Sequence, residues 1–217
     1  MNPLRRIREP FSGLSHGVGV PLAMVAMIVL LAASGGKPRH LIGFVIYGVS
    51  LIALYAASAL YHSLRVGPRA IAWLQRLDHS AIFLLIAGSY TPFCLVTLHG
   101  VWGWSLLGAV YALATVGVAL SVFGHKLPEW PRVTLYLLMG WLSVLAFGPL
   151  RAHLPPAGLG WLMAGGVVYS LGAVIFATDR PHLWPGKFSA HDLWHLFVLG
   201  GSACHFIVML WFVAPAL

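Results

Sequence analysis

The sequence predicts an all-α membrane protein, a bundle of seven transmembrane helices. Of its 217 residues, 59% are hydrophobic and only 8% are charged, and the mean hydropathy is +0.86. Seven apolar stretches are long enough to cross about 30 Å of hydrocarbon as helices of about 20 residues. Their connections are short and rich in proline and glycine, which leaves no room for a soluble domain. We therefore expect one integral membrane domain that covers residues 1–217.

The first four apolar stretches are separated by residues that break helices. The first, 14–33, follows a basic N-terminal run, and the second, 41–64, begins after a Gly-Gly-Lys-Pro sequence. A Gly-Pro pair precedes the third stretch, 71–98, and only two residues separate it from the fourth, 101–123. Each stretch is therefore expected to form one membrane-spanning helix.

Proline also delimits the last three stretches. The fifth, 133–150, follows Pro-Glu-Trp-Pro, and the sixth, 159–178, follows a Pro-Pro pair. The seventh, 190–214, comes after a connection that runs from Pro181 to Gly186. The sequence contains no internal repeat, so the inverted halves that are typical of transporters are not predicted.

The distribution of lysine and arginine predicts the orientation, because these residues are retained on the cytoplasmic side of short loops. With the N-terminus inside, ten of the 13 lysines and arginines are cytoplasmic and three are outside. We expect a cytoplasmic N-terminus and an external C-terminus. The formal charge of +8 then reflects topology and anionic lipid, and no basic domain suggests nucleic acid as a partner. The cytoplasmic set is Arg5, Arg6, Arg8, Arg65, Arg69, Arg76, Lys126, Arg132, Arg180 and Lys187, and the outer set is Lys37, Arg39 and Arg151.

Two histidines one helical turn apart open the last apolar stretch. His191 and His195 occupy positions i and i+4, which share one face of an α-helix, so their imidazoles can bind a single metal. In the orientation above, His62 lies near the cytoplasmic end of the second stretch and Asp78 lies in the first turns of the third. Three imidazoles and one carboxylate are thus expected in one cytoplasmic-side layer, where ionisable groups are costly and usually functional.

This combination is typical of a catalytic zinc site. Three neutral imidazoles leave the fourth corner of a tetrahedral Zn²⁺ site to water, and Asp78 could orient that water and take its proton. Ser58 lies one turn from His62 on the same face and could hold Asp78, the water or a substrate carbonyl through its hydroxyl group. The predicted metal ligands are His62, His191 and His195, and the candidate catalytic residues are Asp78 and Ser58.

Simpler interpretations exist for the same residues. Asp78 could form an ion pair with Arg76 or Arg180, and Ser58 could serve only close packing of helices. Haem ligation is less consistent with the pattern, because two histidines from one helical turn suit a small cation better. A zinc transporter would need carboxylates along a path, and the chain has only five acidic residues.

Three polar residues near the predicted site have other expected roles. Asp192 falls in the first turn of the last helix, where the helix dipole favours an acidic cap. His16 enters from the same side on the first helix and could belong to the outer shell of the site. His79 is one residue off the face of Asp78 and is not expected to be a ligand.

Two features lie further along the helices. His205 is 14 positions past His191, about 21 Å along the helix axis, so it cannot share the metal. It could form a hydrogen bond inside the bundle or mark a passage, and the first role is the one that we expect. Pro92 removes a backbone donor and frees the carbonyl of Gly88, which predicts a kink in the third helix. Tight packing at Gly88 is an equally good explanation of this motif.

The dispersed motifs resemble those of a known family, the haemolysin III proteins. These are related to the progestin and adipoQ receptors, which include the adiponectin receptors, and more remotely to alkaline ceramidases. The resemblance spans nearly the whole chain and implies seven helices, zinc on three histidines, an aspartate near the water at the zinc, and a location in a bacterial inner membrane. Its motifs are Ser58-xxx-His62, Leu77-Asp78-His79 leading into Ala87-Gly88-Ser89-Tyr90-Thr91-Pro92-Phe93, and His191-xxx-His195 leading into Gly200-Gly201-Ser202.

Two functions follow from this pattern. The first is an intramembrane zinc-dependent hydrolase, similar to a ceramidase, that cleaves an amide or ester bond of a membrane lipid near the cytoplasmic leaflet. The second is a non-catalytic membrane protein whose structural zinc joins helices and whose role is signalling, membrane stress response or cytolysis. The second function predicts a closed site that no cavity reaches. The sequence predicts neither the lipid substrate nor the oligomeric state.

Overall fold

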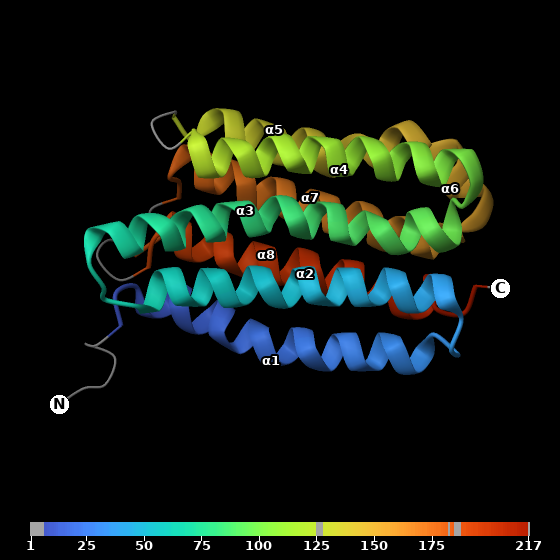
Figure 1. The fold of residues 1–217 in the computed structure, drawn as a ribbon, viewed down its shortest axis with the longest axis horizontal. Helices are drawn as coiled ribbons and strands as arrows, with labels where there is room; N and C mark the ends of the chain where they lie inside the picture. Colours follow the sequence, from blue (N-terminus) through green and yellow to red (C-terminus); the bar gives the residue numbers. More distant parts are fainter. Residues whose placement is uncertain (1–6, 125–127, 182, 185–187, 217) are drawn as a thin grey trace.

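A computed structural model describes residues 7–124, 128–181, 183–184 and 188–216. Within these residues, seven helices are long and apolar enough to cross a membrane, which confirms the predicted fold class. Figure 1 shows them side by side in one bundle, with the described chain beginning at one end and finishing at the opposite end. The expected cytoplasmic residues Arg5, Arg6, Lys126 and Lys187 lie outside the described residues.

The spans follow one another in the predicted order. The first four are α1 (Pro10–Ala33), α2 (Pro38–Ser63), α3 (Pro68–Pro92) with its π-helical continuation η2 (Phe93–Thr97), and α4 (Gly100–Phe123). The fifth span consists of α5 (Trp130–Trp141), the 3₁₀ segment η3 (Leu142–Ala146) and α6 (Phe147–His153). The sixth span is α7 (Pro156–Thr178). The seventh is α8 (Ala190–Val208) with its π-helical continuation η4 (Met209–Val213).

Several spans begin earlier than the sequence patterns predict. The second span starts at Pro38 rather than at position 41, and the third starts at Pro68 rather than at position 71. The fifth and sixth spans are likewise extended by three residues. A proline occupies one of the first two helical positions in each of these four helices. Its fixed φ suits the first turn and its missing N–H has no helical partner there, so these prolines begin helices.

The fifth span is not the single regular helix that the apolar stretch 133–150 predicts. It changes to 3₁₀ geometry at Leu142–Ala146 before α6 resumes. Pro149 gives the physical reason, because its ring clashes with the carbonyl of Leu145 four residues earlier and it cannot donate a helical hydrogen bond. Tyr90 of α3 stabilises the interruption, since its hydroxyl donates to the Met139 carbonyl at 2.8 Å and accepts the Ser143 N–H at 2.9 Å.

Pro92 lies where α3 passes into the π-helix η2. The helix therefore changes its hydrogen-bond pattern at the predicted position. Close packing is present as well, because a Cβ atom on Gly88 would lie 2.2 Å from the Ser50 hydroxyl oxygen, and one on Gly43 would lie 2.9 Å from Pro92 Cα. Glycines thus let α2 and α3 approach each other closely, as small residues do in membrane bundles.

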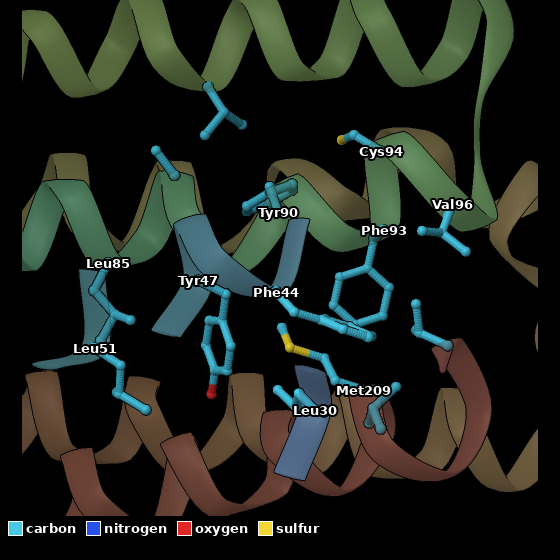
Figure 2. Close-up of a cluster of buried hydrophobic side chains, with 14 of the residues drawn as sticks. Leu30, Phe44, Tyr47, Leu51, Leu85, Tyr90, Phe93, Cys94, Val96 and Met209 are labelled. Atoms are coloured by element: carbon cyan, nitrogen blue, oxygen red, sulfur yellow. The ribbon is translucent and has the colours of Figure 1, made fainter. Parts of the chain in front are cut away.

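A cluster of buried side chains joins the N-terminal helices to the C-terminal segment. Figure 2 shows Phe44 of α2 beside Phe93 of η2, with Leu30 of α1 and Met209 of η4 close by. Leu30, Phe44 and Met209 are completely inaccessible to solvent. Because surrounding lipid is as apolar as these side chains, van der Waals packing supplies most of the stabilisation here.

The packing of α8 places its first turns beside the end of α2. α8 packs against α7 on one side and α1 on the other, while α1 packs along α2 and α2 along α3. The start of α8, the end of α2 and the start of α3 consequently meet at one end of the bundle (Figure 1). This end carries all the residues that the sequence proposes for the site.

A glycine substitution tests the close contact of α2 with α3. We expect Gly43→Val to lower the free energy of unfolding by about 1–3 kcal/mol, because its Cβ meets a backbone atom that cannot rotate away. Gly108→Val is the matched control, since no atom lies within 4 Å of a Cβ there. Thermal unfolding in detergent compares the two variants, and equal midpoints would contradict the packing argument.

Candidate metal centre

Three histidines from two helices converge at one end of the bundle. His191 Nε2 lies 3.4 Å from His62 Nε2 and 3.2 Å from His195 Nε2. Among the described residues, these three are the group whose ligand atoms could hold a metal ion, all within 4.8 Å of one another. His62 and His195 are only 1% and 2% exposed. The predicted ligand set is therefore brought together in space.

The separation of the nitrogen atoms provides a test of fit. Zn–N bonds of about 2.0–2.1 Å at a tetrahedral angle hold two ligand nitrogens about 3.3–3.4 Å apart. The two nearest Nε2 pairs, at 3.2 and 3.4 Å, match this spacing. Imidazole is also a suitable ligand for several first-row metals. The three histidines could therefore hold a small metal ion.

Local sequence fixes the two histidines of α8. Ser189 caps this helix through a capping box, in which the Asp192 N–H donates to the Ser189 hydroxyl oxygen at 3.1 Å and the Ser189 N–H donates to Asp192 Oδ2 at 2.9 Å. The Ser12 hydroxyl of α1 donates to the other Asp192 oxygen at 2.7 Å. Asp192 is therefore a cap, as predicted, and it also ties α8 to α1 next to His191.

Asp78 and Ser58 lie beside the histidines. Both side chains are buried, and both line the same cavity as His191 and His195. Among the described residues, Asp78 forms no ion pair with Arg76 or Arg180. The Arg76 guanidinium instead lies over the Trp73 ring, 4.8 Å from its centroid. The ion-pair alternative for Asp78 is not supported by this arrangement.

His16, His79 and His205 remain outside the converging group. The His16 ring is buried with its centroid 4.0 Å from that of His195, and neither of its ring nitrogens has a hydrogen-bond partner among the described residues. His205 accords with the prediction of an internal hydrogen bond, because its Nδ1 donates to the Gly201 carbonyl at 2.9 Å. His79 offers its main-chain carbonyl to Tyr136 at 3.0 Å.

Glu9 is a neighbour of the site that the sequence patterns do not indicate. It precedes the first turn of α1, and its carboxylate accepts a hydrogen bond from His62 Nδ1. This hydrogen bond lowers the pKa of the Glu9 carboxyl below its usual value, and the charges of His62 and Arg8 add to the effect while partial burial opposes it. Glu9 is one of only five acidic residues in the chain, and this scarcity is the one feature of the sequence that singles it out.

A cavity of about 130 Å³ reaches the histidine cluster. Its walls are mostly apolar and come from α2, α3, α5, α7 and α8, with His16 of α1. One end of the cavity is lined by Asp78, Ser58 and His191. Its far part is lined by His205, which follows His191 by 14 residues on α8, a rise of about 21 Å. The site is thus connected to an elongated apolar space inside the bundle.

Comparison with known proteins gives a consistent family assignment. A family model described as "Haemolysin-III related" matches residues 4–206. The chain is 41% identical to "Hemolysin-3" of Bacillus cereus over 209 residues, which cover 95% of this chain and 92% of that protein. It is 39% identical to the "Hemolysin-3 homolog" of Bacillus subtilis, with 94% and 93% coverage. The human "Monocyte to macrophage differentiation factor" is 27% identical, with 74% and 66% coverage.

Removal of one imidazole tests the metal centre. We expect purified wild-type protein to hold close to one equivalent of metal and His191→Ala to lose most of it, because two ligands bind a metal far more weakly than three. Elemental analysis after extensive dialysis measures the content. His205→Ala is the matched control, since this histidine is on the same helix but outside the group. Equal metal content in both variants would show that the histidines are not its ligands.

Proposed function

The chain belongs to the haemolysin-III-related family of multi-pass membrane proteins, and we propose that it is an intramembrane zinc-dependent hydrolase of lipid amide or ester bonds. One observation carries this proposal. Three imidazole nitrogens lie within 4.8 Å of one another, two of the pairs at the separation that a tetrahedral ion needs, and an apolar cavity leads to them. A water-excluding passage that ends at polar groups suits a substrate with a long apolar part and one polar bond.

The ion best matched to this ligand set is Zn²⁺. Three neutral imidazoles with a free fourth position are characteristic of catalytic zinc, whereas structural zinc has four protein ligands. When bound, the zinc would lower the pKa of a water molecule to about 7 and polarise a carbonyl group. His62, His191 and His195 would hold it, and the rest of the chemistry depends on neighbouring side chains.

Asp78 is the proposed general base. Its carboxylate is buried beside the histidines, and Ser58 lines the same cavity, where its hydroxyl can donate a hydrogen bond to this carboxylate. It can therefore accept a proton from the attacking water and return it to the leaving amine or alkoxide as the bond breaks. Ser58 acts as a positioning residue for Asp78, which accounts for a buried hydroxyl at this point of α2.

The cavity defines the class of substrate. Its walls between Asp78 and His205 are mainly aliphatic and aromatic, so an acyl chain can lie there while the scissile bond meets the histidines.

The distribution of basic residues favours a site in the cytoplasmic leaflet of a bacterial inner membrane. Six described arginines are at the histidine end of the bundle, and three lysines or arginines are at the other end. The six are Arg8, Arg65, Arg69, Arg76, Arg132 and Arg180, and the three are Lys37, Arg39 and Arg151.

A non-catalytic role is the second candidate. An ion on these residues would join α2 to α8, as expected of a structural metal, and two relatives carry the name hemolysin. This role in signalling, membrane stress response or cytolysis predicts a closed site. The cavity that reaches His191 and His195 favours the hydrolase instead.

An isosteric substitution tests the proposed base. We expect Asp78→Asn to keep its zinc within about twofold but to lose about 10²–10⁴-fold in hydrolysis, because an amide cannot take a proton from water. Mass spectrometry of ceramide-like lipids and glycerolipids incubated with the purified protein measures the products. Asp179→Asn is the control, since Asp179 ends α7 with φ 50°, a conformation that asparagine also tolerates.

Three outcomes separate the candidate functions. Zinc-dependent turnover that disappears in Asp78→Asn supports the hydrolase. Full turnover in that variant would remove the proposed role of Asp78. Stoichiometric zinc without turnover of any lipid in the wild-type protein would favour the structural role.

A further inference from the structure

The segment before α1 is attached to the end of α2 that carries His62. The main-chain N–H of Glu9 donates to the His62 carbonyl at 2.8 Å, and that of Arg8 donates to the Ser63 carbonyl at 3.3 Å. The Arg65 guanidinium donates to the Ile7 carbonyl at 3.1 Å. These contacts hold residues 7–9, which lie outside the membrane-spanning helices, in one position relative to the imidazole of His62.

Side chains fix the Glu9 carboxylate within this segment. One oxygen accepts the hydrogen bond from His62 Nδ1, and the other is 3.2 Å from Arg8 Nε. Arg8 is held in turn, because its guanidinium lies 4.3 Å from the centroid of the Tyr61 ring. The carboxylate therefore has a defined orientation even though the Glu9 side chain is 44% exposed.

The contact determines which nitrogen of His62 is available to a metal. A carboxylate accepts hydrogen bonds and does not donate them, so Nδ1 must carry the proton. A neutral imidazole then has an unprotonated Nε2, and this is the atom that faces His191 Nε2 at 3.4 Å. Glu9 lies on the opposite side of the ring and is not part of the group that can hold a metal.

Among the described residues, His62 differs from His191 and His195 because its Nδ1 has a carboxylate partner. His195 Nδ1 is buried without a hydrogen-bond partner, and His191 is hydrogen-bonded through Nε2 alone. A carboxylate behind a ligating imidazole fixes the ring and makes the metal-bound nitrogen more basic. This effect is available to His62 only.

We propose that Glu9 is a positioning residue for the metal centre, which sets the tautomer and orientation of His62 from a segment outside the membrane. The inference depends on the proposal that the three histidines hold zinc. It adds a fourth chain segment to the site and makes the affinity for zinc depend on residues 7–9.

Zinc affinity of Glu9 variants tests this role. Apo-protein in detergent is titrated with zinc against a chromophoric chelator. We expect the dissociation constant to rise 10–100-fold in Glu9→Ala, the usual effect of losing such a partner. Glu9→Gln should give a smaller rise, because its amide oxygen can still accept the Nδ1 proton but carries no charge. Glu129→Gln is the matched control, since Glu129 is similarly exposed and pairs with Arg132 instead of a histidine.

Each result decides the question. The graded loss of affinity, with unchanged thermal stability of the metal-free variants, supports the positioning role. Affinity in Glu9→Ala within twofold of wild type would overturn it while leaving the zinc site intact. An equal fall in the stability of the metal-free and zinc-loaded forms would overturn it too, by assigning Glu9 a purely structural contact. Failure of the wild-type protein to bind zinc would instead overturn the proposed function itself.

Discussion

Burial of ionisable groups in an apolar bundle is the constraint on which this structure depends. A polar group away from water costs free energy unless it has a partner, and the cost is higher still inside a membrane. Three imidazole nitrogens face one another across 3.2 and 3.4 Å, and Asp78 is buried beside them. Imidazole lone pairs that point at one place repel each other unless a proton or cation lies between them. A metal ion at this point satisfies all three at once, which is why the geometry favours a metal centre over a set of independent hydrogen bonds.

The surrounding contacts keep that end of the bundle in register. The capping box at Ser189 and Asp192 sets the start of α8, and the Ser12 hydroxyl fixes the same aspartate to α1. On the other side, Glu9 holds the ring of His62 at the end of α2. The three histidines therefore belong to helices whose ends are tied together by polar contacts, while glycine contacts such as Gly43 with Pro92 hold the apolar parts of α2 and α3. Rigidity of this kind is what a metal site requires of its supporting residues.

Much of this arrangement could be predicted from the sequence, for identifiable reasons. Apolar length determines the spans, and the i, i+4 spacing of His191 and His195 determines their common face, so the histidine group followed from topology. The apolar stretches predict helix starts that are too late, because they exclude the prolines before them, which are well suited to a first turn. The 3₁₀ segment at Leu142–Ala146 depends on Pro149 together with the Tyr90 hydroxyl of another helix. Glu9 lies 53 residues from His62 in an irregular segment, where no periodicity predicts a contact.

The proposed centre consists of three imidazoles that hold zinc with a fourth position free for water. X-ray absorption at the zinc edge of the purified protein measures the ligand atoms and their distances directly. We expect a four-coordinate ion with nitrogen or oxygen ligands at about 2.0–2.1 Å and a multiple-scattering pattern of about three imidazoles. A sulfur ligand at about 2.3 Å, or a six-coordinate shell of oxygen atoms without imidazole scattering, would contradict it.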